Sequence, residues 1–118
     1  MIAVIFEVEP AEGQREAYLD LAAALRPQLE KMHGFISVER FQSITDPKKM
    51  LSLSFWRDED AVRAWRTHAA HRATQTKGRA GIFQGYRLRI AEVSRDYGMR
   101  ERREQAPEDS RRSHDHMV

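Results

Sequence analysis

Apolar and polar residues alternate along four segments of the chain, and such alternation predicts β-strands. The four segments are residues 2–8, 35–42, 50–56 and 82–93. In the third segment, Leu51, Leu53 and Phe55 are expected on one face of the strand and Trp56 on the other. In the first segment, Ala3 and Ile5 oppose the main apolar stripe. We place Trp56 on the same sheet face as these two residues.

The last segment carries the longest alternation in the chain. Tyr86, Leu88 and Ile90 share one predicted face of this strand, and Phe83 is expected on the opposite face together with Ala91. An apolar side chain on the second face of the sheet must also be covered, so these assignments decide which residues each sheet face presents.

Two further segments repeat apolar residues at the spacing of an amphipathic helix. The first spans residues 11–32; Pro27 predicts a local irregularity within it, and Gly34 a stop. The second begins after Asp58, a favourable N-cap, and is expected to end near Gly78. The apolar stripes of the two helices are Tyr18, Leu21, Ala22, Leu25, Leu29 and Met32, and Ala61, Val62, Trp65 and Ala69.

The predicted order of elements is β-α-β-β-α-β, which indicates an α+β fold of the ferredoxin-like type with a four-stranded antiparallel sheet. Two helices can cover only one face of that sheet. The other face also carries apolar residues, and a domain of this size does not leave such a face in water. We therefore expect a second subunit, a ligand, or both, to cover it.

The C-terminal residues differ in composition from the rest of the chain. Residues 98–118 hold five Arg, five acidic residues and no aromatic side chain. Such a segment buries too little apolar surface to offset the entropy lost on ordering. We predict a folded domain over residues 1–97 and a largely disordered tail over residues 98–118, in which residues 99–105 could become helical against a partner.

Composition excludes several classes of protein. The chain has 118 residues, no Cys and a formal net charge of +2, so a disulfide scaffold and a cysteine zinc site are impossible. No apolar run approaches the roughly 20 residues of a membrane span, and no secretory signal is apparent. The small charge excess gives no reason to expect a nucleic-acid partner. These features favour a cytoplasmic location.

Three stretches of the chain resemble the antibiotic biosynthesis monooxygenase family of dimeric α/β barrels. They are the opening IAVIFEVEPAEGQREAYLDLAAALRP, the centre GFISVERFQS with KKMLSLSFWRDEDAVRAW, and the close THAAHRATQTKGRAGIFQGYRLRIAEV. The resemblance covers about residues 1–97. It implies a homodimer in which two sheets close a barrel, and a pocket between the sheet and the helices of each protomer. It also implies oxygenation of a polycyclic or quinol substrate without a cofactor in some members.

Chemistry of that kind needs an apolar cavity for a planar ring and one group that accepts a proton. His68 and His71 are the candidate bases, and Trp65 is a candidate wall of the cavity, although its helical spacing also fits a core anchor. The further aromatic residues expected to line a substrate pocket are Phe6, Phe35, Phe55, Trp56 and Phe83.

Two other functions stay open. A haem-binding or haem-degrading protein is one, since other family members degrade haem; Trp65 matches their Trp, but Gln75 stands where the iron ligand is expected and Phe6 or Glu7 where an Asn is expected. A non-enzymatic dimeric accessory or stress protein is the other. His68 and His71 lie three residues apart, but a third ligand is not evident, so no metal site is predicted.

Overall fold

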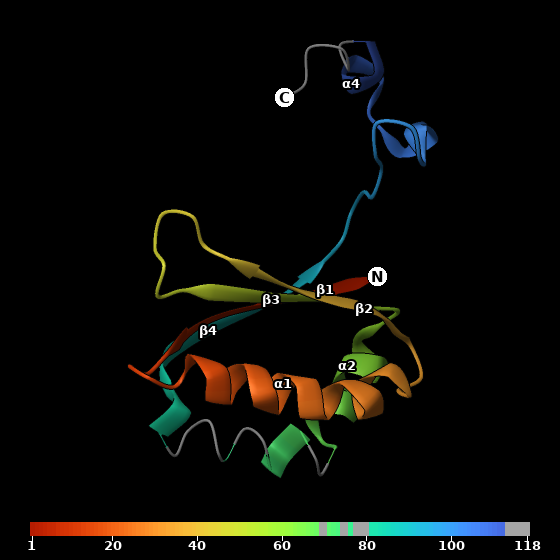
Figure 1. Ribbon diagram of the computed structural model, residues 1–118. Coiled ribbons are helices and arrows are strands. Elements are labelled where there is room, and N and C mark those ends of the chain that lie inside the picture. The colour runs from red at the N-terminus through yellow and green to blue at the C-terminus, as the bar shows by residue number, and fades with distance from the viewer. Residues whose placement is uncertain (69–70, 74–75, 77–80, 113–118) are drawn as a thin grey trace.

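The computed structural model describes residues 1–68, 71–73, 76 and 81–112. A four-stranded antiparallel sheet with the strand order β2-β3-β1-β4 forms its centre. The strands are β1 (Ile2–Pro10), β2 (Phe35–Gln42), β3 (Met50–Trp56) and β4 (Phe83–Glu92). Helices α1 (Arg15–Glu30) and α2 (Glu59–Arg66) lie on one face of the sheet, and no described helix lies against the other face in Figure 1. The predicted ferredoxin-like α+β fold is confirmed.

The pairing register of β1 and β3 decides which residues face the helices. Ile2 lies opposite Trp56, and Ala3 lies opposite Phe55. Because paired residues of antiparallel strands share a face, Trp56 belongs to the helix side and Phe55 to the open side. The prediction that Trp56 shares a face with Ala3 was wrong: it is Trp56, and not its neighbour Phe55, that pairs in register with the helix-side residues of β1.

The start of β4 departs from regular alternation. The pairing of β1 with β4 shifts between Glu9 and Pro10, and Pro10 lies opposite Phe83. The Phe83 ring packs 5.8 Å from that of Phe6 and 6.2 Å from that of Tyr86. The prediction that Phe83 and Tyr86 face opposite ways was therefore wrong, because an irregularity moves the alternation by one residue.

Helix α1 is shorter than its apolar spacing predicted. Residues 11–14 form a turn in which the backbone N–H of Gln14 donates to Ala11 at 2.8 Å, and the helix begins at Arg15. The helix continues past Pro27 to Glu30. Its buried side chains are Tyr18, Ala22 and Leu29. The helix thus presents one apolar stripe to the sheet over its whole length.

Helix α2 begins where its N-cap was predicted. The Asp58 carboxylate accepts a hydrogen bond from the backbone N–H of Ala61 at 2.9 Å. This bond, and a second from Arg57, hold the pKa of Asp58 below its usual value of 3.8. The helix ends at Arg66, and residues 71–73 are helical again. Ala69 and Gly78, which the sequence placed in and at the end of this helix, lie outside the described residues.

The link between α1 and β2 passes close beneath α2. Gly34 has a φ of +86°, and a Cβ built there would lie 2.7 Å from the Cβ of Ala61. The Gly34 carbonyl accepts the backbone N–H of Arg57 at 2.8 Å. Both the left-handed backbone and the close approach require glycine at this point, so Gly34 fixes how closely α2 sits against the end of α1.

The core between sheet and helices has two centres. The first combines Ile2, Leu29, Trp56, Ala61 and Val62, with Val4, Met32, Phe35, Val38 and Trp65 packed around them. The second combines Val8, Tyr18 and Met50, with Phe6, Leu19, Ile82 and Phe83 around them. The two centres lie at opposite ends of β1, since Ile2 begins that strand and Val8 lies near its end.

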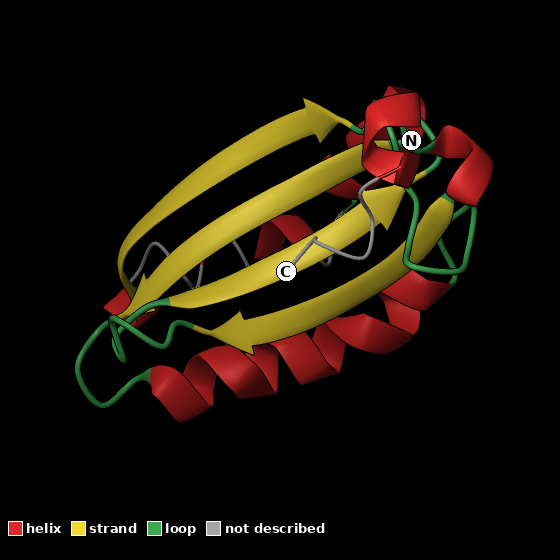
Figure 2. Ribbon diagram, turned by 90° about the horizontal axis from the view of Figure 1, so that it is seen from above, coloured by secondary structure: helices red, strands yellow, loops and turns green. Residues whose placement is uncertain are grey.

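The C-terminal segment projects from the sheet instead of packing on it. After β4 the chain rises on the open side and forms the short helices η2 (Arg103–Gln105) and α4 (Glu108–Arg112), above the end of the sheet that holds the N-terminus (Figures 1 and 2). Within the part of the chain that the structure describes, no helix has the length and apolar character needed to cross a membrane.

Candidate functional site

Two tryptophans and two histidines form a stack of rings on the helix side of the sheet. The Trp56 indole, 1% exposed, donates from Nε1 to Oγ of Ser54 at 3.0 Å. Trp65 from α2 lies over it, with ring centroids 6.4 Å apart and planes inclined by 29°. His71 and His68 stack on Trp65 at 4.8 and 5.5 Å, each inclined by 28°. The structure therefore brings together Trp56, Trp65, His68 and His71.

His71 differs from an ordinary surface histidine in its environment. Its Nδ1 atom is buried without a hydrogen-bond partner. The backbone at Arg66 and Trp65 favours the charged imidazole and partly offsets the effect of burial on its pKa. Burial is the main cause that lowers the pKa of His71 below 6.5, so the imidazole is neutral at pH 7.

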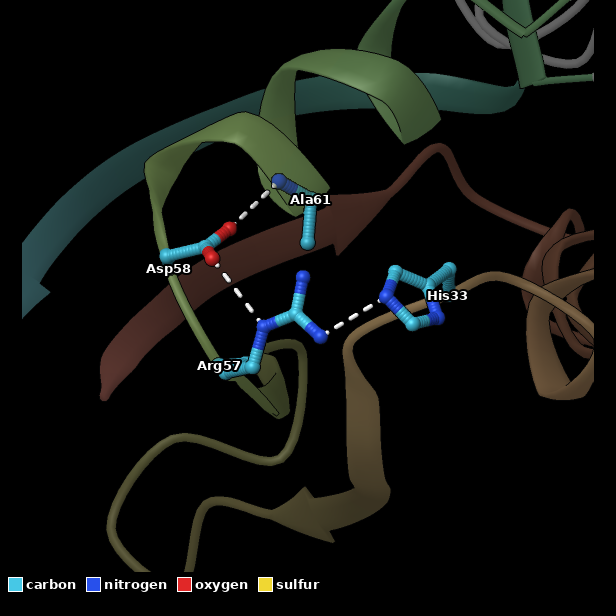
Figure 3. A network of polar contacts seen from close by, with 4 residues as sticks. All are labelled: His33, Arg57, Asp58 and Ala61. Carbon is cyan, nitrogen blue, oxygen red and sulfur yellow. Dashed lines mark hydrogen bonds and ion pairs between the residues drawn. The ribbon is translucent and has the colours of Figure 1, made fainter.

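The other imidazoles of the predicted domain have different surroundings. His68 is partly exposed and stacks on Trp65, and its backbone N–H donates to Trp65 at 3.0 Å. His33 lies on the surface, where Nη1 of Arg57 is 2.8 Å from its Nε2 and Nε of Arg57 donates to Asp58 at 3.0 Å (Figure 3). Arginine has no acceptor, so His33 accepts in this network, which fastens the end of α1 to the start of α2.

The five predicted aromatic lining residues do not form a single wall. Phe35 packs edge-on against Trp56 at 5.4 Å and belongs to the cluster that contains Trp65. Phe6 and Phe83 pack against each other in the second cluster. Phe55 faces the open side of the sheet, away from the other four.

Sequence reasoning missed an exposed apolar surface on β4. Tyr86, Leu88 and Ile90 point to the helix side, yet they are 55%, 50% and 44% exposed. The cause is topological: β4 is an edge strand, and in Figure 2 α1 runs along the opposite, β2 side of the sheet. Ile90 lies opposite Val4, which packs into the cluster that contains Trp65. We call Tyr86, Leu88 and Ile90 the β4 shelf; one strand separates it from the ring stack.

A groove of about 440 Å³ lies elsewhere, at the end of the sheet where β1 finishes and β4 begins. Its charged lining residues are Glu7, Glu9, Lys49, Arg87 and Arg89, and Arg89 pairs with Glu7 at 3.4 Å. None of the histidines that the structure describes lines this mixed-charge groove. Among the described residues, no group of three or more His, Asp or Glu side chains is placed to hold a metal ion. Gln75, the position compared with a haem ligand, lies outside those residues.

The comparison with protein families matches residues 1–77 to the antibiotic biosynthesis monooxygenase model. The chain belongs to the antibiotic biosynthesis monooxygenase family. A jasmonate monooxygenase of Pyricularia oryzae is 47% identical over 94 residues, which is 80% of this chain and 44% of that protein. The chain thus spans less than half the length of that relative.

The chain is also similar to a bacterial protein and to a solved structure. An uncharacterized Bacillus subtilis protein, YqjZ, is 30% identical over 79% of each chain. The crystal structure of a putative antibiotic biosynthesis monooxygenase from Deinococcus radiodurans superposes with a TM-score of 0.75 at 8% identity. That match covers 83% of this chain and 97% of the other. At such low identity the structural likeness shows the shared fold alone.

Proposed function

We propose that this family member is a monooxygenase that acts, without a cofactor, on an aromatic or quinol-like small molecule bound on the helix side of the sheet. The observation that carries the proposal is the partly buried His71 imidazole, which packs on Trp65 and whose Nδ1 has no hydrogen-bond partner. A neutral imidazole in this state is a proton acceptor whose orientation is already set.

The reaction needs an electron-rich substrate with an acidic proton next to its ring. The neutral imidazole of His71 takes that proton from carbon, and the resulting carbanion passes electrons to dioxygen and forms a C–O bond. The imidazolium returns its proton to the peroxide oxygen. Loss of water from the hydroperoxide leaves a carbonyl, so that a CH₂ group and O₂ become C=O and H₂O.

The surroundings of His71 suit a planar apolar substrate. Trp65 presents an indole next to the imidazole, and the β4 shelf offers partly exposed apolar side chains one strand away. An aromatic ring placed between them gains offset stacking and buries the shelf. Both effects favour a flat, apolar ligand over a charged one.

A second copy of the chain is the partner proposed for the open face. That face carries Ala3, Ile5, Leu51, Leu53 and Phe55. Its charged residues are self-complementary, with acids on β1 and bases on β4, at Glu7 and Arg89 for example. A twofold dimer requires one surface that complements itself. The homodimer would cover the apolar face that one protomer leaves open.

The substrate class is tested by oxygen uptake with the purified chain. An anthrone and a naphthohydroquinone represent the proposed class. Jasmonic acid is included because the Pyricularia relative is named a jasmonate monooxygenase. With the anthrone we expect one O₂ to be consumed per carbonyl formed, and with the naphthohydroquinone one O₂ to be consumed and one H₂O₂ released per quinone formed. Neither reaction should need an added metal, flavin or nicotinamide. Uptake that appears only after such a cofactor is added would contradict the proposal.

The alternative function, that of a haem protein, is tested by titrating the same protein preparation with hemin. A histidine bound to the iron shifts the Soret band, and that shift should depend on His68 or His71. An unchanged spectrum together with quinol oxidation supports the proposed function. A shifted spectrum with no oxidation of any substrate would replace it with the haem alternative.

A further inference from the structure

The segment that follows β4 has a structure of its own. In residues 94–112, which we call the arm, Oε1 of Gln105 accepts the backbone N–H of Asp96 at 3.1 Å, and Arg102 pairs with Asp96 at 3.2 Å. Arg102 has a backbone φ of +54°, a left-handed conformation that residues other than glycine rarely adopt. Ala106 is only 2% exposed. These contacts give the described part of this hydrophilic segment a defined local structure.

The arm does not lie flat on its own domain. It stands on the open side of the sheet (Figure 1), and the radius of gyration of the chain is 16.7 Å. A compact domain of this length has a radius of gyration of about 13.5 Å. The arm also leaves Met99 74% exposed. An ordered projection with an exposed Met is suited to contact another molecule.

The mixed-charge groove lies at the opposite end of the same face. The arm leaves the sheet beside Ile2, which pairs with Glu92, whereas the groove lies near Val8, which pairs with Tyr86. Six residues of β1 separate these two points, or about 20 Å. The groove combines two acids with three bases, and the arm combines six Arg with five acidic residues. Bases of the groove could therefore pair with acids of an arm, and acids of the groove with arginines of an arm.

We propose that the mixed-charge groove receives the arm of a second copy of the chain. In a face-to-face dimer whose strands run in opposite directions, the arm end of each protomer meets the groove end of its partner. The contact therefore forms twice. Met99 would lie near Lys49 of the partner subunit, and the arm's charges would pair within the groove. This inference rests on the second copy proposed above, but not on any catalytic activity.

Cross-linking tests the placement because the chain has no Cys. Full-length Met99→Cys and Lys49→Cys variants, one carrying a size tag, are mixed and treated with a short bis-maleimide. The matched control replaces Lys49→Cys with Ala24→Cys, an exposed residue of α1 in the helix layer on the other face of the sheet. We expect the 99–49 product in at least about fivefold excess over the 99–24 product. Circular dichroism verifies that each variant folds.

The outcomes separate this inference from the proposed function. Equal yields of the 99–49 and 99–24 products would overturn the placement of the arm. So would cross-linking of position 99 only to itself, which indicates that the arms meet each other. Light scattering of the unmodified chain supplies the second test: a monomer at every concentration overturns both the dimer and the arm contact, whereas quinol oxidation is measured independently of either.

Discussion

At the scale of single residues, His71 is the group whose chemistry the fold determines most closely. Burial lowers its pKa, and its ring packs on Trp65 with the two planes inclined by 28°. His68 stacks on the same indole, and both imidazoles are of intermediate exposure. What sets His71 apart is its buried Nδ1 without a hydrogen-bond partner, together with a pKa that burial lowers.

Replacing His71→Gln should remove the base. We expect kcat for oxygenation of the anthrone to fall about 10²–10⁴-fold, the usual contribution of a general base, with little change in KM. His68→Gln is the matched control and should change kcat less than about tenfold. Oxygen-uptake kinetics measure both variants. Equal losses in the two variants, or a loss confined to His68→Gln, would show that His71 is not the base.

Burial of His71 also makes the stability of the protein depend on pH. A lowered pKa in the folded state means that the unfolded chain takes up the proton more readily below pH 6.5. The free energy of unfolding should therefore decrease as the pH falls from 6.5 towards the lower pKa of the folded protein. Above pH 7, His71 is neutral in both states, so the free energy of unfolding should no longer change with pH because of this residue.

Urea unfolding at several pH values between 5 and 8 measures this effect. The His71→Gln variant keeps every other titrating group, so its stability should depend less steeply on pH than that of the unmodified chain. Parallel curves for the two proteins would show that His71 titrates alike in the folded and unfolded states.

At the scale of elements, the contact between α1, β2 and α2 depends on Gly34. A side chain there must adopt a positive φ, and its Cβ would come within 2.7 Å of the Cβ of Ala61, which must then move. We expect Gly34→Ala to destabilise the fold by about 2–4 kcal/mol. Gly13 also has a positive φ but open space around it, so Gly13→Ala should cost less. Denaturant unfolding compares the two, and equal losses would show that the contact with Ala61 has no energetic weight.

The order of elements and the N-cap at Asp58 were predictable because each depends on residues close together in the sequence. The face of Trp56 was not, since it depends on which residue of β1 pairs with it. The face of Phe83 depends on an irregularity at Pro10, which is distant in the sequence. Long-range register has no local signal, and a shift of one residue exchanges the two faces of a strand.

The candidate site was predicted in part for the same reason. Trp65, His68 and His71 follow one another at intervals of three residues, a spacing that is readable in the sequence. The exposure of the β4 shelf requires knowing that β4 is an edge strand. The unpaired state of Nδ1 on His71 is a matter of three-dimensional contacts, which spacing alone does not reveal.

At the scale of the whole molecule, the open face is the contact proposed for a dimer. Leu53 lies near its centre, opposite Ile5 on one side and Glu39 on the other. Leu53→Glu should place a charge in the middle of the proposed dimer contact and raise the dimer dissociation constant at least about 30-fold, as for a central interface residue. Ala24→Glu on α1 is the control. Light scattering measures both, and an intact Leu53→Glu dimer would exclude this face as the contact.

The ring stack also gives the molecule an optical property. Both tryptophans of the chain lie in it, 6.4 Å apart, and one of them touches His71. All tryptophan fluorescence therefore originates at the candidate site. A protonated imidazole quenches the fluorescence of a neighbouring indole, and a bound quinone quenches it by accepting the excitation of the indole. The unlabelled protein thus emits a signal that follows both the protonation of His71 and the arrival of a ligand.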